Sequence, residues 1–158
     1  MSVTKTTVNK LPCIKCPRAG IILYNKDWFG LGIDTKTGEL TDFGGGVSVK
    51  KKETVIEGAL REFHEETLSV YPLTYKDIEN SVVMYNQYNL LIFKFINADP
   101  FKISADFNEK CKHVNNPEVS GIKWLSWTEF KNCIDHRDKL FFRLQSFLQQ
   151  AENFFWLL

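Results

Sequence analysis

The chain has 158 residues, of which 44% are hydrophobic and 25% charged, an ordinary composition for one globular domain. A formal net charge of +1 argues against a broad nucleic-acid-binding surface built on overall charge. There is no apolar stretch of the roughly 20 residues that a membrane-spanning helix needs, and the polar start of the chain lacks the apolar core of a signal peptide. We therefore expect a single domain over residues 1–158 that is cytoplasmic, has no membrane partner and keeps its cysteines reduced.

The first part of the chain is predicted to form strands followed by a helix. Apolar runs bounded by turn residues predict strands over residues 19–24, 28–33 and 39–43. The glycines Gly44–Gly46 come next, and we expect them in a loop, because three consecutive glycines are a poor strand or helix interior. Thr54 and Glu57 have the spacing of a capping box, which predicts a helix that begins just after Glu53.

The rest of the chain is predicted to return to strands and to end in a helix. Runs rich in β-branched and aromatic residues predict strands over residues 81–85, 88–96 and 119–125. Residues 99–116 are polar and predict a long loop, and Ser126 with Glu129 forms a second capping box. From Leu140 to Leu158 apolar residues recur at three- and four-residue steps, which predicts one amphipathic helix. The end of this helix is rich in aromatic residues, and these are candidates for a contact between two copies of the chain in a homodimer. They are Phe154, Phe155 and Trp156.

Three carboxylates lie on one stripe of the first predicted helix. With Glu62 taken as zero and about 100° per residue, Glu65 falls near −60° and Glu66 near +40°. Clustered carboxylates repel one another, so a fold keeps them together mainly where a cation neutralises them. Hard oxygen ligands at this density suit Mg²⁺ or Mn²⁺. The alternative is a solvated acidic face, and the glycine run before the helix favours the metal site, because it lets the backbone approach a ligand.

The stretch from Gly45 to Ser69 resembles the Nudix box, G-x5-E-x7-R-E-U-x-E-E-x-G-U, where U is a bulky apolar residue. The residues that match at the required spacing are Glu53, Arg61, Glu62, Phe63, Glu65 and Glu66. Gly46 lies one residue too far from Glu53, which indicates an insertion in the intervening loop. Leu68 and Ser69 replace the second glycine and the apolar residue after it. Because this removes the residue best suited to a left-handed helix end, we expect the helix to terminate in a different way.

The resemblance covers most of the chain and implies an α/β fold, a Nudix-type α/β/α sandwich with a mixed β-sheet between helices. That architecture agrees with the predicted order of strands and helices. The resemblance also implies a metal-dependent pyrophosphohydrolase in which Glu62, Glu65 and Glu66 bind Mg²⁺ or Mn²⁺. Arg61 is cationic and is expected to hold a carboxylate of the cluster, for which Glu53 is the candidate.

Further site residues are expected around the box. Many Nudix enzymes use one more acid from outside it, as a metal ligand or general base, and Glu118 is the first candidate and Glu109 the second. The residues expected to bind substrate phosphates are Gly45, Gly46, Lys50, Lys51 and Lys52. The alternative for the three lysines is a solvated loop.

The default substrate class for this family is a nucleoside diphosphate linked to another moiety. The glycine loop and the R-E-F-x-E-E-T motif also look like Nudix proteins of eukaryotes and their large DNA viruses, some of which remove mRNA caps or hydrolyse diphosphoinositol polyphosphates. The candidate substrates are therefore the mRNA 5′ cap of capped RNA, a diphosphoinositol polyphosphate or a dinucleoside polyphosphate. A non-catalytic Nudix-fold binding module is the alternative class, although such modules typically lose box carboxylates that this chain keeps.

Two other groups of residues carry weaker signals. The aromatic residues considered for base stacking, each of them more simply explained as core, are Trp28, Phe29, Tyr85 and Trp124. Cys13 and Cys16 form a C-x-x-C, half of a zinc-ribbon signature. Cys111 and Cys133 stand apart and do not supply the other half, so a zinc site is disfavoured.

Overall fold

In a computed structural model, which describes residues 2–136 and 139–158 apart from the side chains of residues 156 and 157, the strands form one mixed sheet. The strands are β1 (Thr4–Thr7), β2 (Arg18–Tyr24), β3 (Trp28–Asp34), β4 (Leu40–Thr41), β5 (Phe43–Gly46), β6 (Val82–Tyr85), β7 (Leu90–Phe95) and β8 (Val119–Ser126). The helices are α1 (Val55–Glu66), α2 (Tyr75–Ile78), α3 (Pro100–Cys111), α4 (Trp127–Asp135) and α5 (Phe142–Ala151), with 3-10 turns over Val8–Lys10 and Glu152–Leu157.

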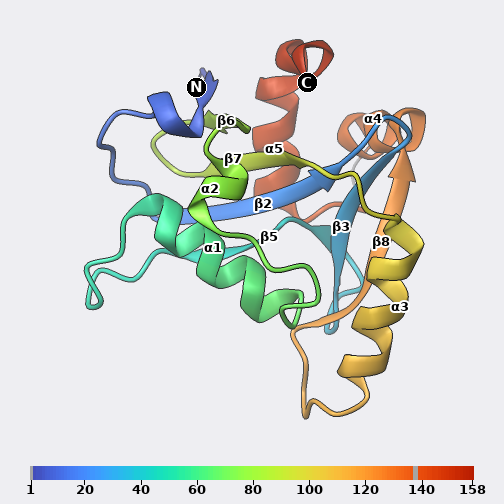
Figure 1. The fold of residues 1–158 in the computed structure, drawn as a ribbon. Helices are drawn as coiled ribbons and strands as arrows, with labels where there is room; N and C mark the ends of the chain where they lie inside the picture. Colours follow the sequence, from blue (N-terminus) through green and yellow to red (C-terminus); the bar gives the residue numbers. More distant parts are fainter. Residues whose placement is uncertain (1, 137–138) are drawn as a thin grey trace.

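The sheet order is β1-β6-β7-β2-β3-β4, with β5 paired to β2 and β8 paired to β3 (Figure 1). The β2–β7 pair is parallel and the other pairs are antiparallel, so the predicted mixed sheet is confirmed. The first strand, β1, was not predicted, because its polar residues lack the apolar pattern of a buried strand. Among the described residues, every helix is too short or too polar to cross a membrane.

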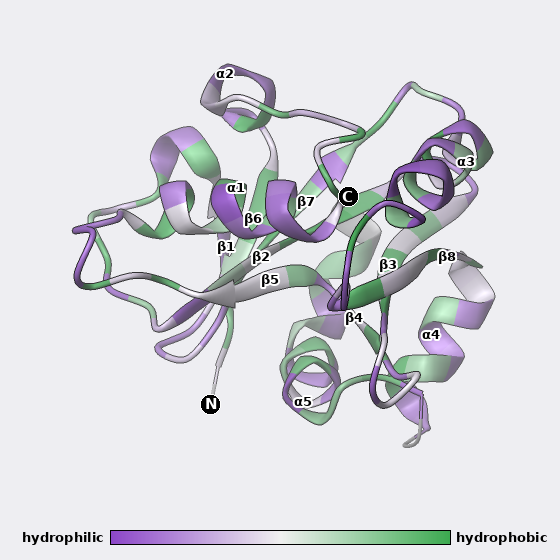
Figure 2. Cartoon of the chain, turned by 90° about the horizontal axis from the view of Figure 1, so that it is seen from below, coloured by the Kyte–Doolittle hydropathy of each residue, from purple (hydrophilic) through white to green (hydrophobic). Residues whose placement is uncertain are grey.

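Helices cover both faces of the sheet, which confirms the predicted α/β/α sandwich. Figure 2 shows α1, α2 and α3 on one side of the strands and α4 and α5 on the other. One hydrophobic cluster joins the sheet to Phe63 of α1 and Phe107 of α3. A second cluster joins the opposite face to Phe130 of α4 and Leu148 of α5. Each face of the sheet therefore has its own core. Helix α1 packs against β2 and β5 on the face covered by the first cluster.

The prediction of a loop over residues 99–116 was wrong, because most of that segment is α3. Asp99 caps this helix by accepting a hydrogen bond from Phe101 N at 3.0 Å, and Pro100 occupies the first turn. Aspartate followed by proline is a helix-start signal that the sequence does contain. The polar residues of the segment form the exposed face of the helix, while Phe107 is fully buried against the sheet.

The predicted single helix from Leu140 to Leu158 was also wrong in its length. The α-helical part ends at Ala151 and continues as the 3-10 turn Glu152–Leu157. In this turn Phe155 packs against Phe130, with 5.7 Å between the ring centroids, so it belongs to the core of its own chain. The side chain of Trp156 lies outside the described part, and the homodimer contact remains a prediction.

Candidate active site

The capping box at the start of α1 forms as predicted. The Thr54 hydroxyl accepts a hydrogen bond from Glu57 N at 3.1 Å, and Glu57 Oε1 accepts one from Thr54 N at 2.9 Å. With this start, α1 packs its apolar residues on β2 and β5, and the acid stripe falls at the edge of that contact. As a result the side chain of Glu62 is only 14% exposed, whereas that of Glu65 is 58% exposed.

The three glycines lie in the strand β5, after Phe43, so the prediction that they form a loop was wrong. The strand is held by β2, where Gly20 lies opposite Gly44. A Cβ on Gly44 would lie 2.7 Å from the Gly20 Cα, and a Cβ on Gly45 would lie 2.5 Å from the carboxyl carbon of Glu62. Glycine is required because the backbone approaches both a neighbouring strand and a carboxylate. Gly44 N also donates to Glu66 Oε1 at 2.9 Å.

Arg61 ties the acidic residues to β5. Its guanidinium pairs with Glu53, as predicted, and Nη1 lies 3.1 Å from Glu62 Oε1 and 3.2 Å from Glu65 Oε1. Nη2 donates to the carbonyl oxygen of Gly46 at 2.9 Å. Its hydrogen bond with Glu53 raises the pKa of Arg61, and the same bond lowers the pKa of Glu53. The single positive charge of Arg61 is therefore shared among the carboxylates of Glu53, Glu62 and Glu65.

Two of the acids are poorly solvated. Burial, together with the nearby charges of Asp42 and Glu62, raises the pKa of Glu66 to about 9. Burial also raises the pKa of Glu62. Asp42 is itself fully buried and pairs with Arg18 through two 2.8 Å hydrogen bonds. Asp42 and Arg18 were not predicted as site residues, although Asp42 lies inside the predicted strand over residues 39–43 and Arg18 directly precedes the one over residues 19–24.

The donor set fits a hard divalent cation chemically, although its members do not converge. In the part of the chain that the structure describes, no three His, Cys, Asp or Glu side chains form a group that could hold a metal ion. Arg61 binds both Glu62 and Glu65, while Glu66 accepts from the β5 backbone. A divalent cation would replace the proton that burial favours on Glu66 and would stabilise the neighbouring carboxylates. The ligand set Glu62, Glu65 and Glu66 remains a prediction.

The two candidates for the additional acid lie in different places. Glu118 lines a small cavity of about 230 Å³ together with Glu65 and Glu66. Its charge also contributes to raising the pKa of Glu62. Glu109 is exposed on α3 and pairs with Lys112 at 3.0 Å, and it does not line that cavity. Of the two, Glu118 is therefore the acid that lies beside the box.

The helix ends in the left-handed conformation even without a glycine, so the prediction of a different ending was wrong. Leu68 and Ser69 both have φ of 55°. The strained backbone is held because Ser69 N donates to the carbonyl oxygen of His64 at 3.0 Å and Leu68 packs against the core. His64 Nε2 accepts a hydrogen bond from Leu73 N at 2.9 Å, which gives this histidine a structural role away from the acids.

The inserted loop between β5 and α1 carries the three lysines, which are all exposed. Ser48 N donates to Glu53 Oε1 at 2.7 Å, so the loop helps to hold the carboxylate that Arg61 binds. Lys51 is one of the charges that lower the pKa of Glu53, and Lys52 has a φ of 53°. A phosphate-binding role for Lys50, Lys51 and Lys52 remains a prediction.

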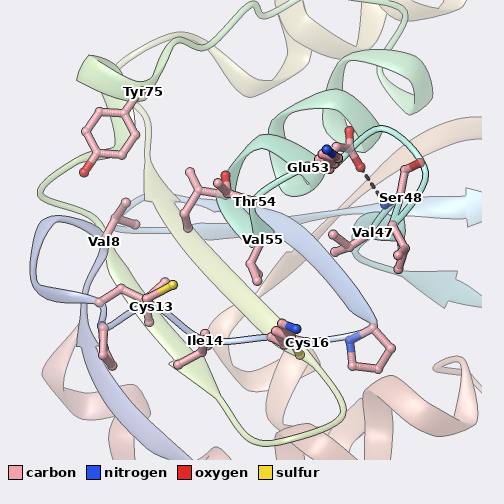
Figure 3. Close-up of a pocket in the computed structure, with 17 residues that line it drawn as sticks. Val8, Cys13, Ile14, Cys16, Val47, Ser48, Glu53, Thr54, Val55 and Tyr75 are labelled. Carbon is pink, nitrogen blue, oxygen red and sulfur yellow. Dashed lines mark hydrogen bonds between the residues drawn. The ribbon is translucent and has the colours of Figure 1, made fainter.

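A largely apolar cavity of about 780 Å³ lies on the other side of this loop. Figure 3 shows it between the segment that carries Val8, Cys13 and Cys16 and the start of α1, with Glu53 and Ser48 at one side. Cys13 is exposed, whereas Cys16 is buried and donates to the carbonyl oxygen of Arg18 at 3.4 Å. The apolar lining does not suit the charged phosphates of a pyrophosphate.

The aromatic residues considered for stacking belong mainly to the core, as the simpler explanation had it. Phe29 and Trp124 are buried, and Trp28 and Tyr85 are half-buried against the hydrophobic cluster under α1. Tyr88 and Phe142, which line a different cavity of about 830 Å³, were not singled out from the sequence.

Three solved structures are similar to this chain over most of its length. A C. elegans Ap4A hydrolase in a binary complex matches with a TM-score of 0.52 and 16% sequence identity, over 89% of this chain and 98% of that chain. A Nudix-family hydrolase from Clostridium perfringens matches with a TM-score of 0.46 and 15% identity, over 86% of this chain and 95% of the other. A Nudix hydrolase from Nitrosomonas europaea matches with a TM-score of 0.49 and 14% sequence identity, over 86% of this chain and 87% of that chain.

Neither a protein-family model nor a curated protein matches the sequence. At these identities the structural likeness establishes the fold alone. The chain has the α/β/α fold of the Nudix hydrolases.

Proposed function

We propose that the chain is a hydrolase of pyrophosphate linkages that uses Mg²⁺ or Mn²⁺. The observation that carries this proposal is the placement of Glu62 and Glu66, which are both poorly solvated. Glu66 lies near the charge of Asp42, and the carboxylate of Glu62 lies against Gly45 of β5. Keeping such a cluster together destabilises the fold unless a cation binds there. A non-catalytic binding module would have no need to retain that arrangement together with Arg61 and Glu53.

The residues have separate roles in this proposal. Glu62, Glu65 and Glu66 would hold the cation, which would neutralise phosphate oxygens and lower the pKa of a bound water. Arg61 keeps the carboxylates in position, and the exposed side chain of Glu65 can turn away from it, because ion pairs of exposed groups are weak. Glu118 lies at the same small cavity as Glu65 and Glu66 and is the proposed general base.

The proposed substrate is a nucleoside diphosphate linked to another moiety. The mRNA 5′ cap, a dinucleoside polyphosphate and a diphosphoinositol polyphosphate are the specific candidates. The shared fold with a protein described as an Ap4A hydrolase supports including dinucleoside polyphosphates. Exposed Lys50, Lys51 and Lys52, on the loop that holds Glu53, are proposed to attract polyanionic substrates such as capped RNA.

Product analysis tests the proposal. The whole chain is incubated with Mg²⁺ or Mn²⁺ and a panel of capped RNA, dinucleoside polyphosphates, nucleotide sugars and diphosphoinositol polyphosphates. We expect a monophosphate product from at least one substrate, and no product in EDTA or with the Glu66→Gln variant. Full turnover in EDTA would remove the metal from the proposal. Release of orthophosphate from monoesters alone would place the chain in another class of enzyme.

A further inference from the structure

A cavity of about 830 Å³ lies between the start of β2, the β6–β7 turn and α5, within the size range of small-molecule sites. The residues that matter for its chemistry are Arg18, Gly46, Tyr88, Asn89, Phe142 and Arg143. Tyr88 is 59% exposed and Phe142 is 65% exposed. The guanidinium carbon of Arg143 lies 5.6 Å from the centre of the Phe142 ring. Exposed aromatic rings at the mouth of a cavity favour a flat, aromatic ligand.

One of the residues that line the cavity, Asn89, has a polar atom without a hydrogen-bond partner. Asn89 is 5% exposed, and its Oδ1 accepts a hydrogen bond from Arg18 Nη1 at 3.3 Å. A guanidinium can only donate, so the amide oxygen must face Arg18 and the amide nitrogen must face away. Among the residues that the structure describes, Asn89 Nδ2 is the one buried side-chain nitrogen or oxygen that lacks a hydrogen-bond partner. A ligand with a hydrogen-bond acceptor would satisfy this donor.

The cavity shares a wall with the acidic cluster. Gly46 lines the cavity, and its carbonyl oxygen accepts the hydrogen bond from Arg61, which also binds Glu62. Arg18 also lines the cavity and binds Asp42 through two hydrogen bonds. The cavity is therefore lined by residues that contact the partners of the box carboxylates.

The charge of the cavity limits what it can bind. Arg18 and Arg143 are the charged residues among those that line it, and Asp42 compensates Arg18 through two hydrogen bonds. The remaining positive charge belongs to Arg143, which is too little to balance an inositol ring that carries many phosphates. The aromatic rings and the amide donor instead suit a neutral ring with acceptor nitrogens or oxygens.

We infer that this cavity binds the nucleobase of the substrate, which stacks on Tyr88 and Phe142 and accepts a hydrogen bond from Asn89 Nδ2. This inference rests on the proposed function for the reaction that follows binding, and it narrows the substrate class to nucleotides. Diphosphoinositol polyphosphates are excluded by it. The base can come from a small nucleotide or from the end of an RNA, because both present the same ring.

An NMR titration of the ¹⁵N-labelled whole chain tests the inference without hydrolysis and without a metal. The probes are adenosine, guanosine and uridine, with ribose and inositol hexakisphosphate as comparisons. We expect at least one nucleoside to shift the side-chain amide signals of Asn89, whereas ribose leaves them unchanged. Equal shifts with ribose, or tighter binding of inositol hexakisphosphate in this cavity, would overturn the inference. A four-nucleotide RNA distinguishes the two sources of the base, since binding more than about tenfold tighter than the nucleoside assigns it to RNA.

Variants locate the contacts. Tyr88→Ala and Phe142→Ala should each weaken nucleoside binding about tenfold, because each removes a stacking surface. Asn89→Asp should weaken it similarly, since it keeps the acceptor for Arg18 and removes the donor. Phe101→Ala is the matched control, because Phe101 is also 59% exposed but lies on α3. Affinity equal to wild type in both aromatic variants would refute the stacking.

The two proposals fail separately. If a nucleoside binds at Asn89 but no pyrophosphate substrate is cleaved, the proposed function is wrong and the nucleobase site stands. If a substrate is cleaved but no nucleoside binds in the cavity, the nucleobase site is wrong and the hydrolase stands.

Discussion

Replacing Glu66 by glutamine should stabilise the metal-free protein while it abolishes hydrolysis. Burial, with Asp42 and Glu62 nearby, raises the pKa of Glu66 from 4.5 to about 9. Below about pH 4.5 this carboxyl is protonated in both the folded and the unfolded chain and does not destabilise the fold. As the pH rises from 4.5 towards 9, it ionises in the unfolded chain but not in the folded one, so the free energy of unfolding falls. At pH 7 the loss is about 3 kcal/mol, on the basis of about 1.4 kcal/mol per pKa unit. Glutamine escapes this loss, because it is neutral at every pH and still accepts from Gly44 N.

The assay is urea unfolding in EDTA at pH 5 and pH 7, with wild type, Glu66→Gln and Glu109→Gln compared. Glu66→Gln should exceed wild type by less than about 1 kcal/mol at pH 5 and by about 3 kcal/mol at pH 7. Glu109→Gln is the control and should follow wild type, because Glu109 is exposed on α3. Identical pH dependence in wild type and Glu66→Gln would refute the desolvation argument. Added Mg²⁺ should stabilise wild type far more than Glu66→Gln, and equal stabilisation would refute the role of Glu66 as a ligand.

Gly45→Ala should lower kcat/KM by about 100-fold or more in steady-state assays, because the new methyl displaces the Glu62 carboxylate. Ser69→Gly should raise the free energy of unfolding by about 1 kcal/mol with unchanged turnover, because glycine adopts the left-handed conformation without strain. His64→Ala should lower stability by about 1 kcal/mol through a lost backbone hydrogen bond and keep kcat, and a folded but inactive variant would contradict the assigned catalytic face. Changing Lys50–Lys52 to glutamine should raise KM for capped RNA more than for a nucleotide sugar at low salt; an unchanged KM on both would assign the lysines to solvent.

Local spacing was enough to predict the helix that carries the acids. Thr54 and Glu57 are three residues apart, and a capping box depends on nothing beyond those residues. The Arg61–Glu53 pair was also predictable, because the motif places both residues beside one loop. The sandwich followed from the order of strands and helices, which the burial of apolar faces constrains strongly.

The errors arose where tertiary partners decide the conformation. The glycine strand β5 exists because Gly20 of β2 allows a close approach, and the local sequence carries no record of that neighbour. The left-handed Leu68 is tolerated because the core holds it, against its own preference. Asn89 and Phe142 meet at one cavity although 53 positions separate them in the sequence, so no local pattern could have paired them.

The pairing of β3 with β8 has a consequence for how the chain reaches its fold. Phe29 pairs with Leu125, so one edge of β3 stays open until almost the whole chain is available. Pairing of such distant segments slows folding, and open apolar strand edges promote association between chains. We therefore expect refolding on a timescale of about milliseconds to seconds in stopped-flow experiments, rather than microseconds. During synthesis, nascent chains that have not yet reached β8 should be the species that chaperones bind.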